Sequence, residues 1–254
     1  MSRTFWNGFG WAAQATFGLM VVVVFFFLRG YVAPPAGGSR LDYLIDAGLA
    51  LQFALPHSTL LLPAVRRRLT RWIPAPMYGA FFCLVASLSL LLAAFCWRPI
   101  GGAVWNLTGD SRTLVVAGYC GAWLALVYSL HLAGLGYQTG WTTWRPWIRG
   151  EPPPERPFRP RSWYRVLRHP VYFSLLGIFW LTPVMSVDRL MLNLVWTAYV
   201  YVGSVLKDRR MVLYIGDPYR DYQATVPGYP GMPAGPLARI PLVKAAADRT
   251  SVAA

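Results

Sequence analysis

Residues 11–28 read WAAQATFGLMVVVVFFFL, a stretch without a charged residue that is followed by Arg29 and Gly30. A helix needs roughly 20 mainly apolar residues to cross the hydrocarbon core of a bilayer. This stretch is therefore predicted to be a membrane-spanning helix. Only Arg3 is charged before it, and no small-residue cleavage pattern follows it, so we expect a retained first helix rather than a signal peptide.

Further apolar stretches follow the first, each bounded by Pro, Gly or Arg, which commonly end helices. Three are long enough to span a bilayer: 43–62, 77–97 and 114–137. Two shorter ones, 171–181 and 190–206, flank a break at 183–189 and predict a helical hairpin that enters the membrane and returns. The sequence thus predicts an all-α polytopic membrane protein with four spanning helices and a C-terminal membrane hairpin.

The composition agrees with a chain solvated by lipid. Hydrophobic residues make up 56% of the 254 residues and charged residues only 13%. The net charge of +14 does not indicate nucleic-acid binding, because the charges lie in the gaps between apolar stretches and form no basic stripe on a soluble fold. The lipid bilayer is the expected partner, and nucleic acid is not.

The distribution of cations predicts the orientation. With both termini on one side, that side carries 19 of the 24 Lys and Arg residues and the other side carries 5. Cytoplasmic loops are enriched in Lys and Arg, so both termini and the 140–169 loop are expected in the cytoplasm, and a bacterial inner membrane is the expected location. In that loop Trp141, Trp144 and Trp147 are expected to anchor at the membrane interface.

Histidine and cysteine limit the possible chemistry. The three cysteines all fall inside apolar helices without metal-ligand spacing, so neither a disulfide framework nor a metal site is predicted. The three histidines, His57, His131 and His169, are all expected on the cytoplasmic side. Ionisable groups at membrane depth are costly and commonly functional, and the alternative is that each histidine only hydrogen-bonds a neighbouring helix.

The strongest motif lies in the last third of the chain. It reads Arg168-His169-Pro170-Val171-Tyr172, then Lys207-Asp208 after the hairpin, then Gly216-Asp217-Pro218-Tyr219-Arg220-Asp221-Tyr222. In this combination the chain resembles the isoprenylcysteine carboxyl methyltransferase superfamily of integral membrane enzymes, over about residues 130–227. The resemblance implies S-adenosylmethionine as the cofactor, bound in a cytoplasmic pocket, with 130–227 as the cofactor-binding part of a single domain, 1–227. Residues 228–254, rich in Gly and Pro, are expected to form a flexible tail.

The resemblance also implies roles for individual residues. The expected cofactor-binding residues are Arg168, His169, Pro170, Tyr172, Asp208, Tyr219 and Tyr222. Arg168 suits the cofactor carboxylate, His169 and Asp208 its polar groups, and the tyrosine rings its adenine or sulfonium. Pro170 suits the first position of a helix. The expected catalytic residues are His57 and His131, either of which can act as a base, with Ser58 as a hydrogen-bonding neighbour.

One branch of the superfamily resembles more of the chain. His57-Ser58, Trp97-Arg98-Pro99 and Phe179-Trp180-Leu181-Thr182-Pro183 are similar to the bacterial methanethiol S-methyltransferases, and NnrU-type membrane proteins share the general plan. The expected activity is therefore methyl transfer to a small or lipophilic thiol such as methanethiol. Two alternatives stay open: carboxyl methylation of an isoprenylcysteine-like lipid, and a non-catalytic NnrU-like protein. The second is favoured by Lys207-Asp208, which stands where the superfamily has a Glu pair.

Overall fold

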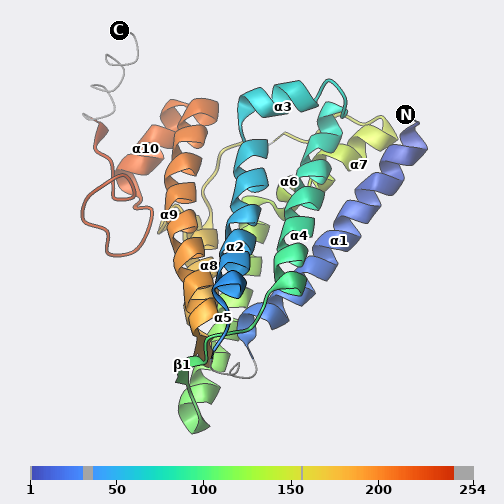
Figure 1. Cartoon of the computed structure of the whole chain (residues 1–254). Coiled ribbons are helices and arrows are strands. Elements are labelled where there is room, and N and C mark those ends of the chain that lie inside the picture. Colours follow the sequence, from blue (N-terminus) through green and yellow to red (C-terminus); the bar gives the residue numbers. More distant parts are fainter. Residues whose placement is uncertain (1, 31–36, 156, 243–254) are drawn as a thin grey trace.

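The computed structural model describes residues 2–30, 37–155 and 157–242. It confirms the all-α polytopic membrane architecture (Figure 1). Four helical stretches in the described part are long and apolar enough to cross a bilayer: α1 (Arg3–Arg29), the 3₁₀ turn η1 (Ala75–Met77) with α4 (Tyr78–Cys96), α5 (Gly109–Ala133) and α9 (Val187–Ile215). A fifth candidate is α2 (Arg40–Leu60), which meets the short α3 (Pro63–Leu69) at an angle of 76°.

The helix ends follow local chemistry. The first helix begins earlier than its apolar stretch predicted, at Arg3, because the Ser2 hydroxyl caps it by accepting a hydrogen bond from the Phe5 amide. At the start of α2, Ser39 and Asp42 form a capping box. These polar caps let each helix extend beyond its apolar stretch.

The predicted hairpin is asymmetric. Its entering limb, α8 (Pro170–Trp180), begins with Pro170 at its first position, as expected. The returning limb, α9, extends nine residues beyond its predicted end at 206 and includes Lys207 and Asp208. The helix continues because its polar C-terminal part packs against α10 (Asp217–Thr225).

Neighbouring helices form a bundle in which α1 packs on α4, α4 on α2, α2 on α9, and α8 on both α5 and α9. The largest buried cluster lies where α1, α2, α5, α8 and α9 meet, and includes Tyr119, Ile178, Phe179, Leu192 and Trp196. Many other apolar side chains, such as Leu19, Val22 and Leu92, face outward. The protein is thus an integral membrane protein whose outer surface is solvated by lipid.

A small antiparallel sheet was not predicted. The strand β1 (Ala103–Asn106) pairs with β2 (Val184–Ser186), which forms the turn of the hairpin. Figure 1 shows β1 at one end of the bundle, with α3 and α7 (Trp141–Arg149) at the other end. The strands satisfy the backbone groups of two loops that meet beyond the helix ends.

The prediction of an interfacial position is wrong for Trp144, one of the three tryptophans in the 140–169 loop. Its ring is fully buried among Trp6, Ala13, Met77 and Ala80. A Cβ atom added to Gly10 would lie 2.7 Å from this indole, so the absent side chain makes room for it. Trp144 therefore fixes α7 to the bundle instead of lying at the headgroups.

The segment after residue 227 also departs from the expected flexible tail. Gly228 donates its backbone N–H to the Leu237 carbonyl, and Ile240 donates to the Gln223 carbonyl. Leu237 and Ala238 are buried. The part of the predicted tail from 228 to 242 thus packs against α10 and the start of α8, whereas 243–254 lies outside the described residues.

Candidate functional site

Asp208 joins three of the predicted site residues. Its Oδ2 accepts a hydrogen bond from Nε of Arg168 at 3.1 Å and forms an ion pair with Nη2 of the same residue at 3.0 Å. Its Oδ1 lies 3.2 Å from Nε2 of His169 and accepts a hydrogen bond from the Tyr219 hydroxyl. Arg168, His169 and Asp208 are all almost fully buried. The structure thus brings together residues from the α8 entry, α9 and α10 around one carboxylate.

Arg168 is saturated by the protein itself. Besides Asp208, its guanidinium donates to the carbonyls of Gln223, Val226, Pro236 and Ala238. A guanidinium has five N–H donors, and these contacts use all of its nitrogens. In this arrangement Arg168 ties the segment after α10 to the site and offers no further donor to a cofactor carboxylate.

His169 retains hydrogen-bonding capacity. Its ring is fully buried and lies between two tyrosine rings, with centroid distances of 5.5 Å to Tyr172 and 5.7 Å to Tyr229. The Nδ1 atom has no hydrogen-bond partner among the described residues, and Nε2 has only its 3.2 Å contact with Asp208, which lacks hydrogen-bond geometry. Burial lowers the pKa of His169, and the Asp208 carboxylate only partly opposes this shift. The ring is therefore neutral at pH 7, with an unpartnered nitrogen.

Tyr219 and Tyr222 lie on α10 and pack at the edge of the Asp208 cluster. Their rings contact each other and Phe158. The Tyr222 hydroxyl donates to the Tyr164 carbonyl, whereas that of Tyr219 donates to Asp208. Burial raises the pKa of both phenols, so both hydroxyls stay protonated and act as donors.

Two cations on α9 belong to this region and were not among the predicted site residues. The ammonium of Lys207 lies 5.5 Å from the ring centroid of Tyr172 and 5.9 Å from that of Tyr164. Arg210 lies on the same helix, near its C-terminal end. The sequence signal for them was present, because Lys207 directly precedes Asp208 and Arg210 follows it by two residues, but Lys207 was interpreted only as a departure from the superfamily pattern.

A second cluster lies between α2 and α9. The Tyr199 hydroxyl is 2.7 Å from Nδ1 of His57 and 3.0 Å from Oγ of Ser58. The His57 ring also contacts the rings of Phe53 and Phe82, at centroid distances of 5.2 and 5.1 Å. The predicted pair His57 and Ser58 is thus brought together by a tyrosine that sequence reasoning missed.

His131 is not part of either cluster. It lies in the last turn of α5 and its side chain is exposed. Tyr172 belongs to the first cluster, because its ring contacts that of His169. An apolar cavity of about 220 Å³ adjoins the first cluster, with Tyr229, Phe173 and Val200 in its wall. No group of three potential metal ligands occurs among the residues that the structure describes.

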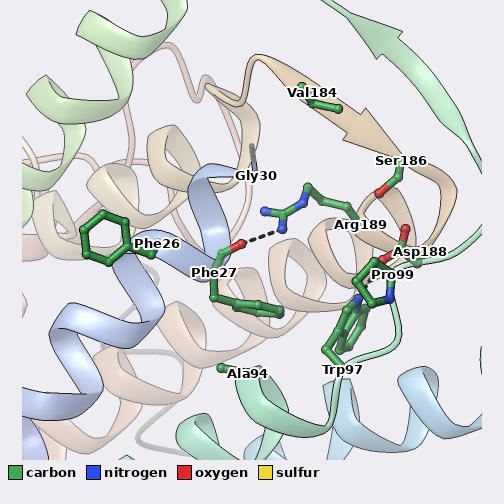
Figure 2. Close-up of a pocket in the computed structure, with 10 residues that line it drawn as sticks. All are labelled: Phe26, Phe27, Gly30, Ala94, Trp97, Pro99, Val184, Ser186, Asp188 and Arg189. Atoms are coloured by element: carbon green, nitrogen blue, oxygen red, sulfur yellow. Dashed lines mark hydrogen bonds between the residues drawn. The ribbon is translucent and has the colours of Figure 1, made fainter. Parts of the chain in front are cut away.

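Another cavity, of about 210 Å³, lies at the far end of α9 (Figure 2). There the Trp97 indole donates to Oδ2 of Asp188 at 2.7 Å, and Arg189 donates to the carbonyls of Phe27 and Leu28. The Trp97-Arg98-Pro99 motif thus ends α4 and joins it to α9. This cavity is separated from both histidine clusters by the buried cluster around Leu192 and Trp196.

Comparison with known proteins gives relatives over most of the chain. It is 32% identical over 192 residues to the methanethiol S-methyltransferase of Pseudomonas sp. (strain GM41(2012)), covering 73% of this chain and 72% of that protein. It is 29% identical to the protein of the same name from Crocosphaera subtropica, covering 89% and 92%. Nurim from Xenopus laevis is 27% identical over 61% of this chain. No family model and no solved structure matches the chain. With its helical membrane fold and its relatives at this level of identity, the chain belongs to the methanethiol S-methyltransferase family.

Proposed function

We propose that this protein transfers a methyl group from S-adenosylmethionine to a small thiol such as methanethiol, giving a methyl sulfide. The observation that carries the proposal is the likeness, over about three quarters of the chain, to proteins named methanethiol S-methyltransferase. The two histidine clusters supply the matching chemistry, one for a polar cofactor and one for a thiol.

The cofactor is assigned to the cluster around His169. Bound there, S-adenosylmethionine supplies an electrophilic methyl group on a sulfonium. The fit rests on the buried, unpartnered Nδ1 of His169, which suits a polar group of the ligand, and on the faces of Tyr172 and Tyr229 beside it. Asp208 holds His169 and Tyr219 in place, and Lys207 adds positive charge suited to a carboxylate.

Arg168 has a different role in this proposal from the one that its motif suggested. Since its donors bind Asp208 and four backbone carbonyls, it positions the site and does not itself bind the cofactor. Tyr222 likewise acts through packing and its bond to the Tyr164 carbonyl.

The thiol is assigned to the cluster around His57. A thiol reacts as the thiolate, and an alkyl thiol is mostly protonated at neutral pH. His57 accepts the proton through its Nε2, because Nδ1 is engaged with Tyr199. Phe53 and Phe82 exclude water from the ring, and this favours an uncharged, apolar acceptor that arrives through the bilayer.

The site is proposed to face the cytoplasm of a bacterial inner membrane. The cluster around His169 includes Asp208, near the C-terminal end of α9 that also contains Lys207, Arg209 and Arg210, and the cluster around His57 contacts the middle of this helix at Tyr199. The positive-inside rule assigns such an end to the cytoplasm, where S-adenosylmethionine is made.

Two measurements test the proposal. The protein purified in detergent is titrated with S-adenosylhomocysteine by calorimetry, and proteoliposomes given methanethiol and S-adenosylmethionine are assayed for dimethyl sulfide by headspace chromatography. We expect saturable binding and sulfide formation. Binding without sulfide would reject the thiol and leave another acceptor, such as a lipid carboxylate. No binding would favour a non-catalytic membrane protein, the alternative that Lys207-Asp208 suggests.

A further inference from the structure

The Tyr199 hydroxyl occupies a position that neither the sequence motifs nor the similar proteins assign. It projects from α9 into the gap toward α2, where it lies 2.7 Å from Nδ1 of His57 and 3.0 Å from Oγ of Ser58. A phenol has one proton to donate and lone pairs that accept. It can therefore connect the histidine and the serine only in one of two directions.

The direction decides what His57 can do. If Tyr199 donates to Nδ1, the neutral ring carries its proton on Nε2 and cannot accept another there. If Nδ1 donates to Tyr199 and Tyr199 donates to Ser58, Nε2 keeps its lone pair and can act as a base. The hydrogen bond made by one ring nitrogen thus determines the state of the other.

We propose that Tyr199 is a positioning residue that accepts the Nδ1 proton of His57 in a hydrogen bond and so holds the tautomer whose Nε2 takes the proton of the acceptor thiol. This inference rests on the proposed function of the site. Ser58 completes the arrangement by accepting the Tyr199 proton, which leaves the tyrosine oxygen available to Nδ1.

The proton transfer balances without another reactant. The S–H bond of the thiol breaks, its electron pair stays on sulfur, and a new N–H bond forms at Nε2. The resulting imidazolium still donates from Nδ1 to Tyr199. With S-adenosylmethionine as the donor, the sulfur would gain the methyl carbon as the carbon–sulfonium bond breaks, and S-adenosylhomocysteine would leave. His57 then returns the proton to water, so that one proton is released for each methyl sulfide formed.

The surroundings of His57 make this support necessary. On α9 its partner is the Tyr199 hydroxyl, and the cations Lys207, Arg209 and Arg210 lie nearer the C-terminal end of that helix, where positive charge disfavours a nearby imidazolium. On its own helix, α2, the neighbour is Ser58, and α4 contributes the ring of Phe82 but no charged side chain. Of the titratable residues of α4, Tyr78 and Cys83 are buried, and the Tyr78 hydroxyl donates to the Leu60 carbonyl. The third, Cys96, is exposed at the opposite end of the helix from Tyr78. No carboxylate faces the ring from these helices, so a neutral acceptor must orient it.

The test uses Tyr199→Phe, which keeps the ring that contacts Phe53 and removes only the hydroxyl. Tyr214→Phe is the matched control, because Tyr214 lies on the same helix and is 58% exposed, away from both clusters. We expect Tyr199→Phe to bind S-adenosylhomocysteine like the wild type and to methylate methanethiol about ten- to a hundred-fold more slowly at pH 7, less than the full effect of removing a general base.

Two readouts separate a role in proton transfer from a role in packing. The defect should shrink as pH rises, because the thiol then ionises in solution, and it should be nearly absent for an acidic aryl thiol that is already ionised at pH 7. An equal loss for both thiols at every pH would overturn the inference, as would wild-type turnover of methanethiol.

A third readout does not depend on activity. The chain has only three histidines, so ¹⁵N-labelled rings can be assigned by single substitutions. We expect His57 of the wild type to carry its proton on Nδ1, and the Tyr199→Phe variant to revert toward the Nε2-protonated form. A wild-type His57 protonated on Nε2 would refute the inference whether or not the protein methylates a thiol. Absence of sulfide with the Nδ1 tautomer present would refute the proposed function alone.

Discussion

Replacing Asp208 by Asn should strongly destabilise the cofactor end of the bundle. The change is nearly isosteric but removes the one carboxylate that bonds Arg168 among the described residues, and Arg168 is only 1% exposed. Breaking a buried ion pair by removing one partner costs about 3–5 kcal/mol, because the remaining charge stays buried. The four carbonyls that also accept from Arg168 keep its donors satisfied, so we expect the lower end of that range, about 3 kcal/mol.

Thermal unfolding of the detergent-purified protein measures this effect. For a chain of this size, about 3 kcal/mol lowers the midpoint by roughly 6–12 °C. Asp217→Asn is the control: it breaks an ion pair with Arg220 that lies on the surface, where such pairs contribute less than about 1 kcal/mol. If Asp208→Asn unfolds within 2 °C of the Asp217→Asn variant, Arg168 is not held by a buried charge pair and the account of this cluster is wrong.

The remaining predictions concern the cofactor, the far end and the topology. His169→Ala should weaken S-adenosylhomocysteine binding about ten- to a hundred-fold in calorimetry, and unchanged binding would contradict the cofactor assignment. Because burial lowers the pKa of His169 in the folded protein, its contribution to the free energy of unfolding should be fully present above the pKa of an unfolded histidine, about 6.5. This contribution should fall by up to ~1.4 kcal/mol per pH unit as the pH drops from there toward the pKa of the folded state. If the thermal midpoint of His169→Ala falls with acid as steeply as that of the wild type, His169 is not the cause of the acid sensitivity. Trp97→Phe should cost about 1–3 kcal/mol in thermal stability by leaving Oδ2 of Asp188 without its donor, and a midpoint unchanged from the wild type would argue against that bond. Cysteines at Gly150 and Gly109 should label from opposite sides of the membrane; labelling from the same side would overturn the helix count.

The helices could be predicted because lipid leaves the chain little choice. A segment that crosses a bilayer must satisfy its backbone internally and present apolar side chains outward, so residues 11–28 can hardly be anything but helix. The length of an apolar stretch does not specify where a helix ends if polar residues extend it beyond that stretch. Lys207 and Asp208 continue α9 only because α10 packs against them, a contact that the local sequence does not encode.

Close packing between distant residues could not be predicted either. A Cβ atom added to Gly79 would lie 2.7 Å from the Cα atom of Gly140, so α4 and the start of α7 touch through two glycines that are far apart in the chain. The burial of Trp144 depends in the same way on Gly10. From the sequence alone, Trp144 is explained as an interfacial residue and a glycine as a turn residue. Only the packed bundle shows that these residues also allow close contact between helices.

Residues of the candidate site could be predicted where their residue type is rare in the chain, as for histidine. They could not be predicted where the type is common, as for tyrosine. Two of the three histidines lie in the clusters, and His169 lies 3.2 Å from Asp208, a residue that the resemblance had placed in the same expected cofactor site. Tyr199 is one of 14 tyrosines and has no motif of its own. Its partner is determined by the register of α9 against α2, and helical periodicity within one segment contains no information on that register.

The replacement of the superfamily's Glu pair by Lys207-Asp208 has a consequence for ligand charge that follows from the cluster. Two glutamates beside Arg168 would leave the buried group with one net negative charge. Here Lys207 and Arg168 against Asp208 leave one positive charge, with His169 neutral. A positive site favours the carboxylate of a methionyl group over its ammonium. Lys207→Glu, which restores the superfamily charge, should therefore weaken binding of S-adenosylhomocysteine more than that of the analogue lacking the carboxylate, and an equal effect on the two ligands in calorimetry would show that the lysine does not face the carboxylate.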